Sequence, residues 1–178
     1  MNKPWIFIAA TISLAVLPLR AAEPEGKPVH YRTFGPGKYQ SFVMNWDEQK
    51  QPVLYARIQT PLEWKEVLHP APVMGQHRPF EPDADFYKKE QLLVVSRVVP
   101  GFHPDKALQV ESVRATKEDL VLRYRYVAPP ATKDAFFKTC LYVAVPQHDY
   151  KRVVFIENGK PVGELKAGEV RSPAPAAR

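Results

Sequence analysis

The most regular alternation of apolar and polar residues runs over positions 119–127. Successive side chains of a β-strand point to opposite faces, so this period-two pattern predicts a strand. The apolar and aromatic residues at even positions from Leu120 to Tyr126 would share one face. Arg123 and Arg125 would lie on the other. One face of this strand is therefore expected to be buried.

Five further segments have the composition of strands. They are rich in aliphatic, aromatic and β-branched residues and are bounded by turn-forming residues: 39–46, 53–59, 92–99, 107–115 and 137–145. Segments 92–99 and 137–145 carry apolar residues on both faces, which is typical of central strands covered on two sides. In the outer strand at 107–115, Val113 departs from the alternation, which predicts a β-bulge or a break in the pattern.

Asn158 and Gly159 lie between two apolar runs and predict a β-hairpin. Both central residues of such a two-residue turn need a positive φ, which Asn and Gly tolerate. Pro161 has no backbone N–H to donate to a neighbouring strand. The returning strand is therefore expected at the edge of a sheet.

The best helix candidate begins after Thr60 and spans 61–68. Thr60 can cap the helix, Pro61 suits its first position, and Glu63 can reach back to the Thr60 amide. These residues form the sequence signature of a capping box. Trp64 would anchor this short helix on the sheet.

Together these patterns predict an α+β protein that is predominantly β, with a mostly antiparallel sheet or sandwich of about six to seven strands and one short packed helix. We expect one β-rich domain at 39–165, preceded by a linker at 23–38 and followed by a disordered tail at 166–178. A proline-rich connection at 69–84 interrupts the domain. Loops longer than about 12 residues are often functional, and a solvated insertion is the alternative.

Residues 1–22 have the layout of a secretory signal peptide. Lys3 gives a positive start, residues 5–19 carry no charge, and small residues follow at Ala21 and Ala22. Cleavage after either alanine stays open. A retained anchor is the alternative, but the uncharged run is shorter than the roughly 17–25 residues of a spanning helix. We therefore expect export to the periplasm or the cell exterior, with no stable membrane span after cleavage.

The mature chain is mildly basic. Its formal charge falls from +6 to +4 when Lys3 and Arg20 leave with the signal peptide. This charge favours solubility, and without a dense basic cluster we expect no nucleic-acid partner. Cys140 is the single cysteine, which excludes an intrachain disulfide. Its apolar neighbours favour a small buried residue over a nucleophile.

No motif announces a reaction. The histidines have no metal-ligand spacing, and neither a Gly-x-Ser-x-Gly turn nor a glycine-rich phosphate loop occurs. We therefore expect no cofactor and no metal. In and just after the proline-rich connection, four residues can converge on a ligand or serve a hydrolase: His69, His77, Asp83 and Asp85. Ordinary surface residues are the alternative, with Asp85 as a cap or turn residue before Phe86.

A second candidate site consists of arginines. Arg97, Arg123 and Arg125, together with the pair Lys151-Arg152, can form a basic strip across one sheet face. Such a strip would hold an acidic peptide or a charged glycan. The alternative is a solvated outer face on which arginines alternate with core residues.

Four features follow one another over residues 53–155: the Thr60-Pro61-Leu62-Glu63-Trp64 helix start, the Asp83-x-Asp85-Phe86 lead-in, the strand at 92–99 and the Leu120-x-Leu122-x-Tyr124 pattern. In this order they resemble the carboxy-terminal domain of PrcB-type proteins. The resemblance implies an exported accessory protein associated with the stabilisation of a surface protease complex. That family has no agreed catalytic residues, so the resemblance assigns none to this chain.

From the sequence we expect an exported, non-enzymatic binding or accessory domain of the cell envelope that contacts another protein. The alternative is a hydrolase or a binding module that acts on an anionic envelope polymer or glycan.

Overall fold

The structure is a computed structural model that describes residues 26–34, 41–70, 82–100, 106–128, 130 and 136–173. Its elements follow in this order: β1 (Lys27–Pro28), β2 (Arg32–Phe34), β3 (Ser41–Val43), β4 (Val53–Ile58), α1 (Pro61–Val67), β5 (Leu68–Pro70), α2 (Ala84–Lys89), β6 (Glu90–Pro100), β7 (Leu108–Ala115), β8 (Asp119–Tyr126), β9 (Phe136–Pro146), β10 (Arg152–Glu157) and β11 (Lys160–Lys166). The predicted signal peptide lies outside the described residues.

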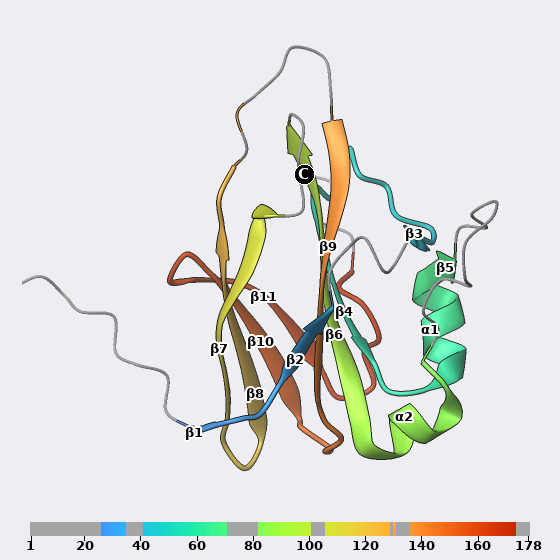
Figure 1. Ribbon diagram of the computed structural model, residues 1–178, viewed down its shortest axis with the longest axis vertical. Coiled ribbons are helices and arrows are strands. Elements are labelled where there is room, and N and C mark those ends of the chain that lie inside the picture. Colours follow the sequence, from blue (N-terminus) through green and yellow to red (C-terminus); the bar gives the residue numbers. More distant parts are fainter. Residues whose placement is uncertain are drawn as a thin grey trace, which may run out of the picture.

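The strands form two main sheets (Figure 1). Sheet A has five strands in the order β1-β7-β8-β10-β11, and sheet B has four in the order β2-β9-β6-β4. Neighbouring strands in these sheets are antiparallel except β8 and β10, which run parallel because the chain passes through β9 in sheet B between them. β3 and β5 form a separate antiparallel pair. The fold is α+β and predominantly β, as predicted.

Sheet B lies between sheet A and the two helices (Figure 1). One face of sheet B packs against sheet A, where Leu93 and Val143 meet Phe155. On the opposite face, Val94 packs in a second core with Trp64 of α1. β6 and β9 contribute to both cores, so the prediction that these two strands are covered on both faces is confirmed.

The predicted alternation in β8 is also confirmed. Leu120 and Tyr124 are fully buried between the sheets, whereas Arg125 on the opposite face is exposed. The predicted irregularity in β7 is a bulge, at which the pairing with β8 shifts between Val110 and Ser112. The bulge restores the inward orientation of the β7 residues that follow it.

The predicted capping box at the start of α1 is present. Thr60 Oγ1 accepts a hydrogen bond from the Glu63 amide at 3.2 Å, and Glu63 Oε2 accepts one from the Thr60 amide at 3.1 Å. Trp64 is 1% exposed and anchors the helix on sheet B. The sequence pattern does not predict α2, because its six residues are too few to show a helical repeat.

The Asn158-Gly159 hairpin joins β10 and β11 as predicted. Their φ angles of +49° and +80° are those a two-residue hairpin turn requires. The Asn158 side chain also exchanges two hydrogen bonds with the Tyr126 backbone, at 3.0 and 3.1 Å, which ties the turn to the end of β8. β11 is an edge strand of sheet A, in agreement with the position of Pro161.

The prediction of a linker at 23–38 is wrong for residues 26–34, which the structure describes. β1 pairs with β7, and β2 pairs with β9. Strands of two or three residues are too short to produce a visible alternation, which is why the prolines and glycines dominate the sequence pattern here.

The tail predicted at 166–178 is likewise wrong as far as Pro173. The Val170 carbonyl accepts a hydrogen bond from the Arg57 amide at 2.8 Å, and the Ser172 amide donates to the Tyr55 carbonyl at 2.8 Å. This segment therefore runs along the outer edge of β4. Its backbone provides these bonds, and the side-chain pattern gives no sign of them.

Arg57 holds the connection between β9 and β10 in place. It is buried between the sheets, where its Nε donates to Gln91 Oε1 at 2.7 Å. Its two terminal nitrogens donate to the carbonyls of His148 and Tyr150, each at 2.9 Å. Burial lowers the pKa of Arg57. The three neutral acceptors satisfy the guanidinium without a carboxylate.

The role of Trp64 can be tested by truncation. We expect Trp64→Ala to lower the free energy of unfolding by about 3–5 kcal/mol, because the change leaves a cavity between α1 and sheet B. Leu62→Ala on the same helix is the matched control, since Leu62 is 67% exposed, and it should cost less than about 0.5 kcal/mol. Urea unfolding followed by circular dichroism measures both. Similar losses in the two variants would contradict this packing.

Candidate functional site

The structure assigns helix roles to the two aspartates of the predicted loop site. Asp83 Oδ1 accepts a hydrogen bond from the Phe86 amide at 2.8 Å and caps α2. The cap is therefore Asp83 rather than Asp85, which instead forms an exposed ion pair with Lys88 at 2.7 Å. His77 and the side chain of His69 lie outside the described residues, so convergence of the four residues stays a prediction.

The three predicted arginines lie on two different surfaces. Arg123 and Arg125 project from the outer face of sheet A, opposite the core-facing residues of β8. Arg97 projects from β6 on the same side as Val95, which packs between the sheets. The prediction of a basic strip is therefore wrong for Arg97. Its strand, β6, belongs to sheet B, and its side chain points between the sheets.

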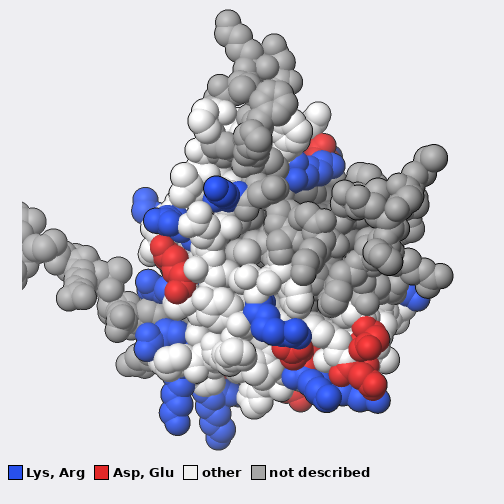
Figure 2. Space-filling view, viewed as in Figure 1, with Lys and Arg blue, Asp and Glu red and all other residues white. Residues whose placement is uncertain are grey.

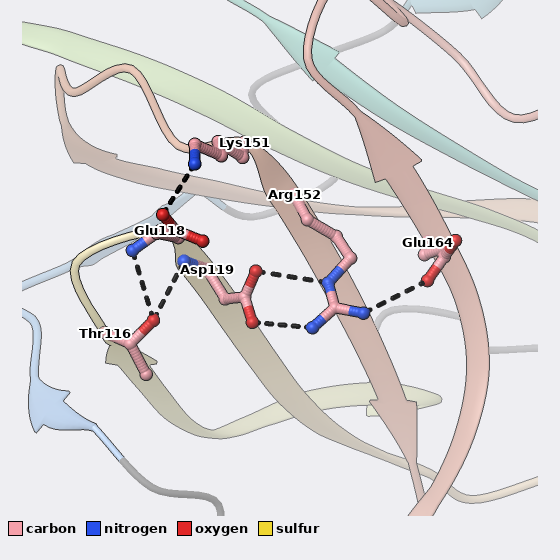
Figure 3. A network of polar contacts seen from close by, with 6 residues as sticks. All are labelled: Thr116, Glu118, Asp119, Lys151, Arg152 and Glu164. Atoms are coloured by element: carbon pink, nitrogen blue, oxygen red, sulfur yellow. Dashed lines mark hydrogen bonds and ion pairs between the residues drawn. The ribbon is translucent and has the colours of Figure 1, made fainter.

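The cations of the pair Lys151-Arg152 are already matched by carboxylates (Figure 3). Lys151 Nζ lies 2.6 Å from Glu118, and Arg152 donates to both oxygens of Asp119, at 3.1 and 2.6 Å. Glu164 of β11 lies 3.8 Å from Arg152 on the other side. The hydrogen bonds from Arg152 lower the pKa of Asp119. This network ties β8, β10 and β11 together and leaves neither cation without a counter-charge.

A cleft of about 460 Å³ opens where the edge of sheet A meets the edge of sheet B. β11 forms one wall, and the start of β4 with the segment that runs along it forms the other. The lining residues are Gln51, Pro52, Val53, Tyr55, Arg97, Glu157, Val162, Gly163, Glu164, Ser172 and Pro173. Of the residues predicted as a site, Arg97 is the one that lines this cleft.

Polar side chains join the two sheets at the cleft. Arg97 donates to Glu157 Oε2 at 2.5 Å, and the Tyr124 hydroxyl donates to the same oxygen at 2.8 Å. The Tyr55 and Tyr124 hydroxyls are 3.4 Å apart. The Arg97 guanidinium carbon lies 3.6 Å from the centre of the Tyr126 ring, in a cation–π contact. We call Tyr55, Arg97, Tyr124 and Glu157 the cleft cluster.

Burial sets the protonation of the two phenols in the cleft cluster. Desolvation raises the pKa of Tyr124, and the neighbouring Tyr55 and Glu157 raise it further. Desolvation also raises the pKa of Tyr55. Both phenols therefore stay protonated near neutral pH. Tyr124 serves as a hydrogen-bond donor to Glu157 and does not act as a base.

Gly163 allows Tyr55 to pack against β11. A Cβ at this position would lie 2.5 Å from the Tyr55 ring, so a larger residue would displace the ring or the strand. Ser172 holds Tyr55 from the other side, because its Oγ accepts a hydrogen bond from the Tyr55 amide at 3.1 Å and another from Gln51 Nε2 at 2.8 Å. Tyr55 is thus held between the two walls of the cleft, with Gly163 of β11 on one side and Ser172 on the other.

The cleft has two carboxylates, but they have different surroundings. Glu157 is held between the sheets by Arg97 and Tyr124, whereas Glu164 lies beside Arg152 on the outer face. Glycoside hydrolysis needs two carboxylates that face one bond from opposite sides. In the part of the chain that the structure describes, no three His, Cys, Asp or Glu side chains gather in a metal-binding group.

Cys140 lies in β9 with its Sγ atom 3.1 Å from Ser96 Oγ. Burial raises the pKa of its thiol, which keeps the sulfur protonated and weakly nucleophilic. Cys140 is partly buried and packs against the core between sheet B and the helices, so it is a packing residue as predicted but is not fully buried.

Sequence reasoning missed Glu157, Tyr55 and Ser172. A signal for Glu157 was present, because Glu157 continues the inward-facing series of Val153 and Phe155 in β10. A carboxylate at such a position needs a buried partner. No comparable signal exists for Ser172, whose place depends on the backbone that follows β11.

No family model, curated protein or solved structure matches this chain. The resemblance to PrcB-type proteins therefore stays a prediction. None of the helices among the described residues is long and apolar enough to cross a membrane.

The inter-sheet ion pair can be tested with a pair of conservative variants. We expect Glu157→Gln to lower the free energy of unfolding by about 1–3 kcal/mol, because Arg97 then lacks a counter-charge but keeps some contact with solvent. Glu164→Gln is the control on the next strand, with an expected cost below about 0.5 kcal/mol. Equal losses by urea unfolding would show that Glu157 has no special role.

The buried phenols predict a loss of stability at high pH. In the unfolded chain, tyrosine titrates near its ordinary pKa of 10.0, whereas burial raises the pKa of Tyr55 and of Tyr124 in the fold. Above about pH 10 the unfolded state therefore binds fewer protons than the folded state. The free energy of unfolding is unaffected below that pH and falls as the pH rises beyond it, by up to about 1.4 kcal/mol per pH unit for each group. Urea unfolding from about pH 8 to about pH 11 measures this slope. Tyr124→Phe should reduce the slope, and an unchanged slope would contradict the assignment.

Proposed function

We propose that this chain is an exported, non-enzymatic binding domain of the cell envelope whose cleft holds an extended segment of another protein. The observation that carries the proposal is the cleft itself, because one of its walls is the edge strand β11. No other described strand pairs with the outer edge of β11. Such an edge presents free backbone groups to which an extended segment can add by hydrogen bonding.

The sequence of β11 restricts where such a segment can bind. Lys160, Pro161 and Lys166 lie at the ends of the strand, and lysine and proline discourage pairing between edge strands. The residues between them that line the cleft are Val162, Gly163 and Glu164. Val162 is 41% exposed, which provides an apolar contact for a side chain of the partner. The site therefore suits a short segment rather than a whole strand.

The cleft cluster supports binding by a polar group of the partner. The two donors to Glu157, from Arg97 and Tyr124, both reach its Oε2 atom. Among the described residues, no hydrogen bond to the Oε1 atom is formed. A backbone amide or a side-chain donor of the partner can therefore bind there without breaking the existing network.

Two further observations support the rest of the proposal. The pattern of residues 1–22 supports export, and the resemblance to PrcB-type accessory proteins supports a role in assisting another protein. The hydrolase alternative stays a prediction, because His77 and the side chain of His69 lie outside the described residues; of its two aspartates, Asp83 caps α2 and Asp85 pairs with Lys88.

Site-specific photo-cross-linking tests the proposal. A benzoylphenylalanine residue is placed at position 162 in the cleft, or at position 62 on α1, where Leu62 is also an exposed apolar residue. We expect irradiation of cells that produce the protein to give a discrete envelope-protein adduct from position 162 and none from position 62. No adduct, or the same adduct from both positions, would contradict the proposal.

A matched pair of substitutions then tests the affinity for the segment identified in the adduct. Val162→Lys adds a charge to the cleft wall, and Leu62→Lys adds the same charge to α1. We expect Val162→Lys to weaken binding of a synthetic peptide of that segment by about tenfold or more, whereas Leu62→Lys leaves it unchanged. Equal affinities of the two variants would place the binding site elsewhere.

A further inference from the structure

Three arginines lie on the outer face of sheet A. Arg123 and Arg125 alternate with the core-facing residues of β8, and Arg114 follows the core-facing Val113 of β7. The helices cover sheet B, and no described helix or strand packs on this face of sheet A (Figure 1). We call Arg114, Arg123 and Arg125 the arginine face.

Neutral groups orient two of the three arginines without cancelling their charge. Arg125 donates to Gln109 Oε1 at 2.6 Å, and Arg114 Nε donates to the Gly26 carbonyl at 3.2 Å. The Nε atom of Arg123 is buried and has no hydrogen-bond partner. Among the described residues, none of these three arginines belongs to an ion pair, although an exposed carboxylate, Glu111, lies in the bulge of β7 close to Arg123 in register.

Three other arginines of the fold differ in this respect. Arg97 is paired with Glu157, Arg152 with Asp119, and Arg32 with Glu90. Arg57 of β4 is also without an ion pair, but it is enclosed and its hydrogen bonds go to neutral acceptors inside the fold. The arginine face instead holds three arginines without an ion pair among the described residues, at neighbouring positions of an outer face that is open to an external anion.

The register of the strands gives these charges a regular spacing. Arg114 lies opposite Val121, two residues before Arg123 on β8, and Arg125 lies two residues beyond it. Residues two apart on a strand are roughly 6.5–7 Å apart, and neighbouring strands are about 4.8 Å apart. The series thus extends along the sheet over the nearly buried Val121 and Ile156. Figure 2 shows Lys and Arg side chains gathered on the side of the molecule where β1 and β7 lie.

We propose that the arginine face binds a linear anionic polysaccharide. Guanidinium groups bind carboxylate, sulfate and phosphate groups through paired hydrogen bonds, and each retains its charge at any physiological pH. A series of charges on an uncovered sheet matches a polymer that repeats its anionic group along an extended chain. This surface is separate from the cleft, so the interaction is additional to the proposed capture of a protein segment.

The experiment uses dextran sulfate as the anionic probe and unmodified dextran as the neutral control, with binding measured at low and at physiological salt. The first variant is Arg123→Gln with Arg125→Gln. The matched control is Lys151→Gln with Arg152→Gln, which removes the same net charge from cations that carboxylates already neutralise (Figure 3). Arg125→Gln alone is added because Arg125 is exposed and its loss should leave the fold intact.

We expect the wild-type protein to bind dextran sulfate and not dextran, more weakly at higher salt because the charges are screened. The variant of Arg123 and Arg125 should bind about tenfold more weakly, whereas the control variant should change by less than about threefold. Arg125→Gln alone should give an intermediate loss.

Three results would overturn the proposal. The first is that the wild-type protein does not bind dextran sulfate. The second is an equal loss in the two double variants, which would mean that net charge alone governs binding. The third is equal or tighter binding of polyglutamate, which would identify an acidic polypeptide as the ligand.

Discussion

Sheet B has to be covered on both faces, and the arrangement of the other elements follows from that requirement. β6 alternates between two apolar cores, with Leu93 and Val95 toward sheet A and Leu92 and Val94 toward the helices. A strand of this kind is stable only as the middle layer of three, because exposure of either face would leave aliphatic side chains in water. Sheet A closes one side, and α1 with its buried tryptophan closes the other. Sheet A needs only one buried face, so its second face is free to carry charged side chains.

The same layering explains where binding can occur. Arg57 and Arg97 both point between the sheets, yet their surroundings differ. Arg57 is enclosed and is satisfied by an amide and two backbone carbonyls, which fixes the connection from β9 to β10. Arg97 lies at the open edge, where Glu157 and Tyr124 complete a network beside the cleft. A charge pair costs less at such an edge than in the centre, because solvent still reaches it. The side chains of the cleft are therefore held in place by hydrogen bonds and are also open to solvent.

Side-chain patterns predicted the parts of the fold that depend on side chains. Alternation identified β8 and the doubly covered strands, the capping box identified α1, and Asn158-Gly159 identified the hairpin. The patterns failed where the backbone decides the structure, as in β1, β2 and the segment along β4. They also failed to predict which side chains meet at the cleft. The neighbours of a side chain depend on the sheet that its strand joins, and the alternation does not show this. Arg97 and Arg123 look alike in sequence, but β6 and β8 belong to different sheets and turn them to different surfaces.

We propose that the edge of β11 receives an extended segment of another protein. Hydrogen exchange measures this most directly, because an added strand protects the backbone amides to which it bonds. The protein is compared with and without a peptide of the segment that cross-links at position 162. We predict slower exchange in β11 on binding, with the amides of β7 unchanged. Unchanged exchange in β11 with a bound peptide, or protection confined to another surface, would contradict the claim.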